Sequence, residues 1–233
     1  MVSVIIPIYN TPKELNQCIA SLSRQIYKDI EIIIVDDGSS PEIDISSIEC
    51  CYPDLNIKFF KINHAGAPRA RNYGFSKSKG DYVLFCDADL ILSSQCIDIM
   101  LARLKKKPDK SYVYSDFKYG WKKFKAWPFD AKKLKRINYI NTCSLIRRSH
   151  FPDTGWDQSL DKFQDWDLWL TFLDQGKTGI YVPELLFKAQ TKRGIYSRWL
   201  PKFFYKLPWL KINSKNKYEK WKKIVQQKHK ISF

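Results

Sequence analysis

The sequence has no apolar run that approaches the ~20 residues a membrane-spanning helix needs. Its first ten residues, MVSVIIPIYN, also lack the basic region and the small-residue cleavage site of a secretory signal. We therefore expect a cytoplasmic protein in which this stretch forms a first β-strand.

Cysteine and histidine are too scattered for a disulfide framework or a zinc site. None of the six cysteines forms a C-x-x-C pair, and the three histidines do not stand at ligand spacing from them. We expect reduced thiols, as in cytosolic proteins. The cysteines are Cys18, Cys50, Cys51, Cys86, Cys96 and Cys143.

Acidic side chains are scarce in two blocks of the chain. Residues 103–136 contain 13 basic and 3 acidic side chains, and residues 198–233 contain 11 and 1. These blocks account for the net charge of +16, because the rest of the chain is balanced or slightly acidic. They indicate an anionic partner: a membrane surface, a phosphorylated acceptor or nucleic acid. The alternative is a solvated lysine surface.

What the sequence does contain is an alternation of apolar strands and helical patterns. An apolar content of 44% and an aromatic content of 15% exclude general disorder. Strands, helices and short loops in turn predict an α/β fold with a doubly wound, mostly parallel central sheet and helices on both faces. The expected strands are Val2–Ile8, Ile30–Val35, Ile57–Ile62 and Tyr82–Cys86.

Acidic side chains follow two of these strands directly. Asp36 and Asp37 come after the second strand, and Asp87 and Asp89 come after the fourth. Open α/β sheets bind ligands at the carboxyl ends of their strands, so we expect both pairs to face one crevice. Carboxylates there suit a divalent metal that carries a phosphorylated substrate. The local alternatives are an Asx turn with Gly38 and solvated caps before the next helix.

Four motifs occur in order: VSVIIPIYN, IEIIIVDDGSS, GAPRARNYGF and GDYVLFCDADLIL. Together they resemble the nucleotide-binding half of inverting, GT-A-fold glycosyltransferases of family 2. The resemblance covers residues 2–92 and continues more weakly to about residue 190. It implies a GT-A domain over residues 1–197, with a nucleotide-binding half over 1–92 and an acceptor-binding and catalytic-base half over 93–197. A small basic aromatic segment, 198–233, would follow.

The resemblance implies roles for five residues of the nucleotide site. Pro7 and Tyr9 would line the pocket for base and ribose. Asp37 would contact uracil, with Asp36 as a second candidate. Arg71 would lie near the uridine or the diphosphate of a nucleotide sugar.

The resemblance also implies a divalent metal cofactor, Mn²⁺ or Mg²⁺. Asp89 matches the carboxylate that binds the metal. Asp87 would contact the ribose, or the metal through a water molecule.

Residues 155–176 form the second landmark, GWDQSLDKFQDWDLWLTFLDQG, which predicts a largely buried helix from Asp165 onward. The resemblance makes Asp165 the general base. The alternative is that Asp165 is only the helix N-cap and that Asp167 suits the helix dipole. Gln164 stands where the family usually has a glutamate.

Four further residues are tentative contacts to the acceptor or the diphosphate: Trp166, Asp167, Lys188 and Gln190. Gln190 stands near the place of a histidine in the family. Because Gly194 follows Arg193, the Gln-x-x-Arg-Trp signature of processive synthases is incomplete, and we expect transfer of a single sugar.

The segment 198–233 interleaves lysine with aromatic side chains, which is typical of an interfacial membrane segment. Trp199, Phe203, Phe204, Trp209 and Trp221 would insert at the headgroup level. The alternative is a C-terminal helix packed on the domain through an apolar face of Tyr218, Trp221, Ile224 and Val225.

The sequence thus predicts an enzyme that moves one sugar, with inversion, from a nucleotide-diphosphate sugar to a glycan or lipid-linked glycan. We expect it in the cytoplasm, with peripheral attachment to the inner face of the cell membrane as an option. A sugar-nucleotidyltransferase is the first alternative, although the turn after the first strand lacks the glycine-rich phosphate loop of that class. A non-catalytic basic module that binds membrane or nucleic acid is the second, although no specific nucleic-acid motif is present.

Overall fold

The computed structural model describes residues 1–190 and 213–231. Trp199, Phe203, Phe204 and Trp209, expected to insert into a membrane, lie outside these residues. None of the helices in the described ranges is long and apolar enough to cross a bilayer.

The nucleotide-binding half forms the parallel part of the sheet. Its strands occur in the spatial order β3-β2-β1-β4, and every neighbouring pair is parallel. The alternation of strands and helices in the sequence therefore predicted this half correctly. The strands are β1 (Val2–Ile8), β2 (Ile30–Asp36), β3 (Asn56–Lys61) and β4 (Tyr82–Phe85).

The second half continues the sheet in mixed orientation. From β4 the order is β8-β6-β9-β5, and β7 pairs with β6 as a hairpin. Strand β5 follows β4 closely in the chain but pairs with β9 at the far end of the order, so the sheet curls. These strands are β5 (Leu90–Leu92), β6 (Tyr112–Tyr119), β7 (Lys122–Phe124), β8 (Leu145–Arg147) and β9 (Gly179–Ala189).

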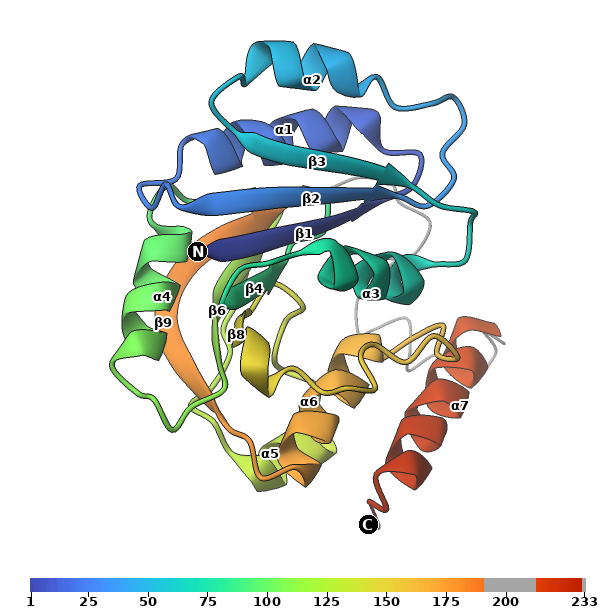
Figure 1. Ribbon diagram of the computed structural model, residues 1–233. Helices are drawn as coiled ribbons and strands as arrows, with labels where there is room; N and C mark the ends of the chain where they lie inside the picture. Colours follow the sequence, from blue (N-terminus) through green and yellow to red (C-terminus); the bar gives the residue numbers. More distant parts are fainter. Residues whose placement is uncertain (191–212, 232–233) are drawn as a thin grey trace.

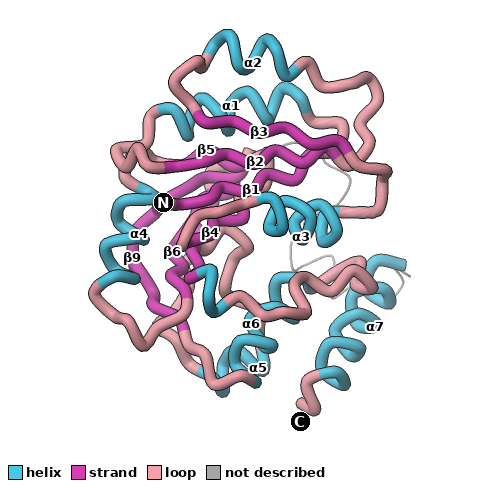
Figure 2. The backbone as a smooth tube through the Cα atoms, viewed as in Figure 1, coloured by secondary structure: helices cyan, strands magenta, loops and turns pink. Residues whose placement is uncertain are grey.

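Helices cover both faces of the sheet (Figure 1). Three pack on one face and contribute to one apolar core: α1 (Pro12–Ser23), α2 (Ile45–Cys51) and α4 (Cys96–Lys105). Four contribute to the core on the other face: α3 (Ala67–Lys77), α5 (Ala131–Arg136), α6 (Gln164–Asp174) and α7 (Asn213–Lys228). A short 3₁₀ helix, η1 (Arg148–His150), follows β8. The tube in Figure 2 shows the same layers, with strands between helices.

Alternation along β1 divides its side chains between the two cores. Val4 and Ile6 belong to the core under α1, whereas Ile5 belongs to the core under α3. A Cβ atom at Gly74 of α3 would lie 2.5 Å from the Ile5 side chain. The missing side chain therefore lets α3 lie close to the sheet, which fixes the position of Arg71 one turn earlier.

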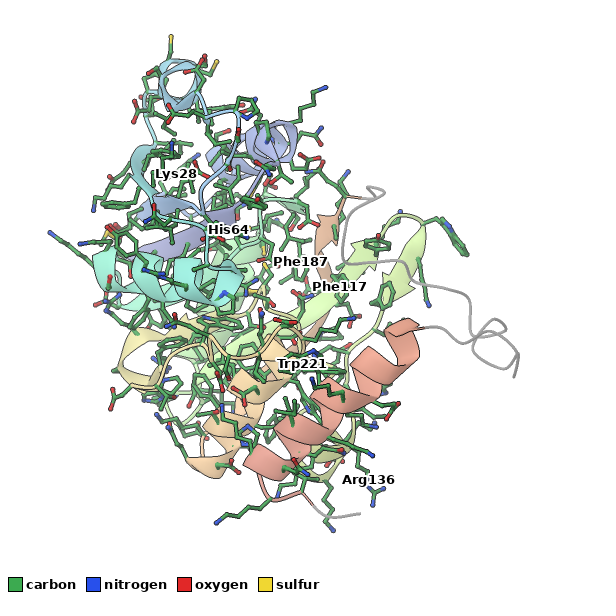
Figure 3. The ribbon with its side chains drawn as sticks, turned by 90° about the vertical axis from the view of Figure 1, so that its right-hand side faces the viewer. Lys28, His64, Phe117, Arg136, Phe187 and Trp221 are labelled. Atoms are coloured by element: carbon green, nitrogen blue, oxygen red, sulfur yellow. The ribbon has the colours of Figure 1, made fainter. Side chains whose placement is uncertain are left out.

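The C-terminal helix α7 packs on the domain. Val225 is fully buried, and Trp221 and Ile224 pack against the core that contains α6. Tyr218 makes an edge-to-face contact with Phe163, with ring centroids 4.8 Å apart. In Figure 3, Trp221 lies between α7 and the body of the domain. For residues 218–231, the structure therefore shows the packed alternative, and the face that contains Trp221, Ile224 and Val225 is turned toward the domain.

Candidate active site

The four predicted carboxylates lie at the carboxyl edge of the parallel strands. Asp36 is the last residue of β2, and the backbone N–H of Asp37 donates to Ile8 O of β1 at 2.8 Å. Asp87 and Asp89 lie in the short connection between β4 and β5. The edge predicted from the sequence is therefore formed as expected.

Asp36 holds the turn after β2. It is fully buried, and its Oδ1 accepts hydrogen bonds from Ser39 N at 2.9 Å and Ser39 Oγ at 2.5 Å. Its Oδ2 is buried without a hydrogen-bond partner in the described residues. Asp36 therefore has the local turn role that the sequence offered as an alternative, with one carboxylate oxygen left over.

Asp37 connects this turn to the loop before α3. Its Oδ1 accepts from Ala65 N at 2.9 Å, and its Oδ2 accepts from Gly66 N at 2.8 Å. His64 Nδ1 lies 2.9 Å from the same Oδ2. These contacts hold a buried carboxylate in one orientation at the strand edge.

Tyr9 is partly exposed beside this carboxylate, and its ring stacks on His64 with centroids 4.1 Å apart. An aromatic face next to a fixed acceptor is a suitable arrangement for a planar base. Pro7 is buried within β1 in register with Val35. It therefore shapes the strand beneath Tyr9.

Arg71 links the two halves of the domain. Its guanidinium donates to Asp87 Oδ1 at 2.6 Å and to Gln164 Oε1 at 3.3 Å, and it lies 4.6 Å from the centre of the Trp156 ring. The side chain is only 7% exposed, and its Nε has no partner in the described part of the chain. Arg71 thus joins the β4 edge to the first residue of α6, a contact that the sequence did not reveal.

Asp89 is the carboxylate that has no hydrogen-bond or ion-pair partner on another described residue; only its own backbone N–H donates to it. Asp89 as a whole residue is exposed. Burial of its carboxylate group, together with the charge of Asp87, nevertheless raises the pKa of Asp89 to about 6. No group of three or more metal-ligating side chains occurs in residues 1–190 and 213–231. Mg²⁺ is often held by one or two carboxylates plus substrate phosphates, so the unpaired Asp89 and its neighbour Asp87 fit such an ion.

Asp165 is the second residue of α6. The helix begins at Gln164, and Phe163 is its N-cap with φ of 62°, so Asp165 is not the N-cap. Its Oδ1 accepts from Trp166 N at 2.9 Å. Burial raises the pKa of Asp165, while hydrogen bonding from Asn138 and the charge of Arg71 oppose that shift. A carboxylate with a raised pKa that lies within the field of Arg71 suits a general base.

Trp166 and Asp167, two of the tentative site residues, are buried and make contacts that hold helices together. Trp166 is 1% exposed and donates from Nε1 to Leu134 O at 2.7 Å. Asp167 is 2% exposed, and its oxygens accept from Lys228 of α7 and from His229, which follows that helix, at 2.8–2.9 Å. The first anchors α5 to α6 and the second anchors α7, so we leave both out of the site.

Lys188 and Gln190 lie at the end of β9, which pairs with β5, the strand that follows Asp89. Gln190 N donates to Asp89 O at 2.9 Å, whereas Lys188 is exposed on β9 in register with Ile91. The side-chain Nε2 of Gln190 is buried without a partner in the described residues. Gln190 therefore brings an unused hydrogen-bond donor to the Asp89 turn.

Sequence reasoning missed the parts of the site that only tertiary packing brings together. His64 was not predicted to belong to the site, although its place after β3 and before α3 is a signal for this edge. Nothing in the local sequence indicates the contact of Asn138 with Asp165. Nor does it indicate that Lys228 and His229 reach Asp167.

Comparison with known proteins relates this chain to glycosyltransferases by sequence and by fold. The family model described as Glycosyl transferase family 2 matches residues 3–156. Glycosyltransferase GlyG of Streptococcus pneumoniae is 33% identical over 124 residues, which cover 51% of this chain and 40% of GlyG. An uncharacterized glycosyltransferase of Rickettsia typhi is 31% identical over 193 residues, which cover 74% of this chain and 58% of that protein. The chain thus spans less than two thirds of the length of either relative.

Solved structures share the fold at low sequence identity. S. aureus TarS 1–349 in complex with UDP-GlcNAc has a TM-score of 0.71 at 19% identity and covers 83% of this chain, which spans 59% of it. The mannosyltransferase PcManGT from Pyrobaculum calidifontis, in complex with GDP-Man and Mn²⁺, has a TM-score of 0.66 at 18% identity, with coverages of 83% and 58%. Family membership also sets aside the sugar-nucleotidyltransferase alternative. On the match of the family model and the GT-A architecture of the sheet, this chain belongs to glycosyl transferase family 2.

Proposed function

We propose that this chain transfers one sugar from a nucleotide-diphosphate sugar, with UDP as the nucleotide, to a glycan or lipid-linked glycan with inversion. The observation that carries the proposal is the pair of hydrogen bonds that Arg71 donates, one to each half of the domain. Its contacts to Asp87 and Gln164 bring the acidic edge of the nucleotide half next to Asp165. In a single displacement, the acceptor hydroxyl attacks the sugar while a base removes its proton and the nucleotide diphosphate leaves. This reaction requires a donor site and a general base close together, and here they lie on opposite sides of one arginine.

The nucleotide is proposed to bind at Tyr9, Asp37 and the turn beyond β4. The aromatic face of Tyr9 would hold the base, and Asp37 would accept from the N–H of uracil. The sugar nucleotides in two structural neighbours, UDP-GlcNAc and GDP-Man, support a donor of this class.

A divalent ion, Mn²⁺ or Mg²⁺, is proposed to be held by Asp89, with Asp87 contributing through water. When bound, such an ion neutralises the charge that develops on a departing diphosphate. Gln190 Nε2, the unused donor beside Asp89, would supply a hydrogen bond to a diphosphate oxygen. Arg71 holds Asp87 in place and offers positive charge on the same side.

Asp165 is proposed to remove the proton from the acceptor hydroxyl. Burial raises the pKa of Asp165, which makes it a better proton acceptor than an ordinary exposed aspartate, while the hydrogen bond from Asn138 and the charge of Arg71 favour the ionised form. Gln164, which replaces the usual glutamate, keeps the acceptor oxygen for Arg71 without adding a second negative charge. Asp165 therefore has one negatively charged neighbour fewer than the family pattern implies.

A screen of nucleotide sugars tests the proposal. Thermal shift with Mn²⁺ or Mg²⁺ identifies the donor, and an assay for released nucleotide diphosphate then measures turnover. We expect one UDP-sugar to stabilise the protein and to release UDP when acceptor glycan is added. Stabilisation by no nucleotide sugar, together with a salt-sensitive shift of DNA, would favour the non-catalytic alternative instead.

A further inference from the structure

We propose that the β6–β7 hairpin, residues 117–125, is a docking surface for an anionic membrane. We call it the basic hairpin. The argument uses its exposed tryptophan, its charge, its rigid support and its place beside the site.

Trp121 lies at the turn of the basic hairpin and is 90% exposed. Gly120 before it has φ of 56°, a backbone conformation that turns the chain between β6 and β7. Large apolar side chains with this exposure are uncommon on a folded surface, and tryptophan prefers the boundary between lipid and water. The turn therefore presents a membrane-seeking side chain.

The charge of the basic hairpin is all of one sign. Its sequence, FKYGWKKFK, contains Lys118, Lys122, Lys123 and Lys125 and no acidic residue. Lys123 and Lys125 are exposed. Each lysine near an anionic bilayer adds to its attraction, whereas a neutral or cationic surface would gain nothing. The complementary partner is thus an anionic lipid surface.

Three phenylalanine rings hold the basic hairpin in place. Phe117 stacks on Phe124 with centroids 5.0 Å apart and on Phe187 of β9 at 5.4 Å. Figure 3 shows Phe117 beside Phe187. Because this stack is already formed in the folded domain, insertion of Trp121 does not require the hairpin to become ordered first.

The basic hairpin projects from the edge that carries the candidate site. Tyr119 at the end of β6 is in register with Ala189 of β9, and the next residue, Gln190, donates to Asp89 O. A bilayer bound by Trp121 would therefore lie beside the Asp89 turn. This consequence, unlike the binding itself, rests on the proposed function: a hydroxyl carried by a lipid would be held near the donor.

The second basic block is a poorer candidate where the structure describes it. Val225 is buried, and Lys228 is paired with Asp157 and Asp167. The apolar face of α7 thus already packs on the domain, while Trp121 is 90% exposed and makes no ring contact within residues 1–190 and 213–231.

Co-sedimentation of the full chain with vesicles tests the proposal. One vesicle set contains phosphatidylglycerol and phosphatidylcholine, and the other contains phosphatidylcholine alone. Two variants remove the basic hairpin's contribution: Trp121→Ala and the double change Lys123→Gln/Lys125→Gln. Their controls lie at the opposite edge of the sheet: Ile26→Ala removes a side chain that is 55% exposed, and Lys105→Gln/Lys106→Gln removes the same charge.

We expect binding to the anionic vesicles only, with release at high salt. Trp121→Ala should weaken it about tenfold, the equivalent of roughly 60 Å² of apolar surface left in water. The double lysine change should weaken it about 30-fold, from about fivefold per lysine. Both controls should bind like the unchanged chain.

Equal losses in the hairpin variants and their controls would overturn the proposal, because general charge would then explain the binding. Binding to soluble polyphosphate with none to anionic vesicles would also overturn it, in favour of a polyanionic polymer. Release of UDP in the screen is measured without vesicles, so failure of either proposal is distinguishable from failure of the other.

Discussion

The two halves of the domain place their acidic side chains by different means. In residues 1–92, Asp37, Asp87 and Asp89 follow parallel strands directly, so the strand ends determine where they lie. In the second half, Asp165 and Asp167 are both on α6, about 200° apart around the helix. Asp165 lies in the field of Arg71, whereas Asp167 pairs with α7. The comparison shows that the position of an acidic residue at a strand end can be predicted from the local sequence. The role of an acidic residue on a helix can be predicted only when the elements that pack on that helix are known.

The sharpest test of this difference is to change the two α6 aspartates separately. Asp165→Asn keeps nearly the same shape but cannot accept a proton, so we expect turnover to fall by about 10²–10⁴ with donor affinity unchanged. Release of nucleotide diphosphate and titration of the donor measure the two effects. Asp167→Asn is the matched control and should keep turnover within a few-fold. If the larger loss followed Asp167→Asn, the assignment of the two helix faces would be wrong.

The next largest effect is expected on the nucleotide side. Asp89→Asn removes a charge without changing shape, and loss of one charge-assisted contact corresponds to about 10–100-fold in donor affinity. The loss should appear only with Mn²⁺ or Mg²⁺ present and should vanish in EDTA. Titration calorimetry of the donor measures it, with Asp109→Asn, an exposed aspartate after α4, as control. Equal donor affinity with and without metal in the unchanged chain would contradict the metal assignment.

A smaller effect, on stability alone, is expected at α7. His229 is 4% exposed and contacts both Asp167 and Asp174. His229→Ala should lower the free energy of unfolding by about 1–3 kcal/mol, because it leaves the buried Asp167 with Lys228 alone. Denaturant unfolding measures this, and donor affinity should not change. Asp174→Asn, on the exposed side of the same contact, should cost less; an equal or larger cost would place the stabilising pair at Asp174.

The smallest effect is a dependence of stability on pH. Burial disfavours the charged imidazolium, but hydrogen bonds to Asp167 and Asp174 outweigh it and raise the pKa of His229. This contribution to stability is therefore complete below the unfolded value of 6.5 and is lost as pH rises through the folded value. Unfolding midpoints measured upward from pH 6 should fall more for the unchanged chain than for His229→Gln.

His150 provides a control of opposite sign. Burial, with the charges of Lys177 and Arg147, lowers the pKa of His150. Protonation of His150 therefore destabilises the fold as pH falls below 6.5, and His150→Gln should remove that loss. The same direction of change in both variants would mean that another group controls the pH dependence.

Much of the nucleotide half could be predicted because its information is local. Apolar runs determined the strands, and the turn residues after them determined the edge. The sequence could not predict that β5 joins β9, because that pairing depends on how the whole sheet curls. Trp166 illustrates the same limit: its indole N–H is directed to Leu134 O by the packing of α5, which no local pattern encodes.

The two basic blocks show that amino-acid composition alone does not distinguish a membrane-binding segment from a helix packed on the domain. Both combine lysine with aromatic side chains, and the sequence offered a membrane or a packed helix for the second. Helical spacing of Trp221, Ile224 and Val225 was the signal for packing, and the structure confirms that face. The basic hairpin has no such spacing, and Trp121 at its turn is left exposed.

A crystal structure with UDP and Mn²⁺ tests the central claim most directly. Anomalous scattering distinguishes Mn²⁺ from water and from the atoms of the protein. The account predicts one strong peak at about 2.1 Å from a carboxylate oxygen of Asp89, next to a diphosphate, with the base beside Tyr9 and Asp37. A metal peak and diphosphate away from the carboxyl edge of β1, β2 and β4 would contradict it.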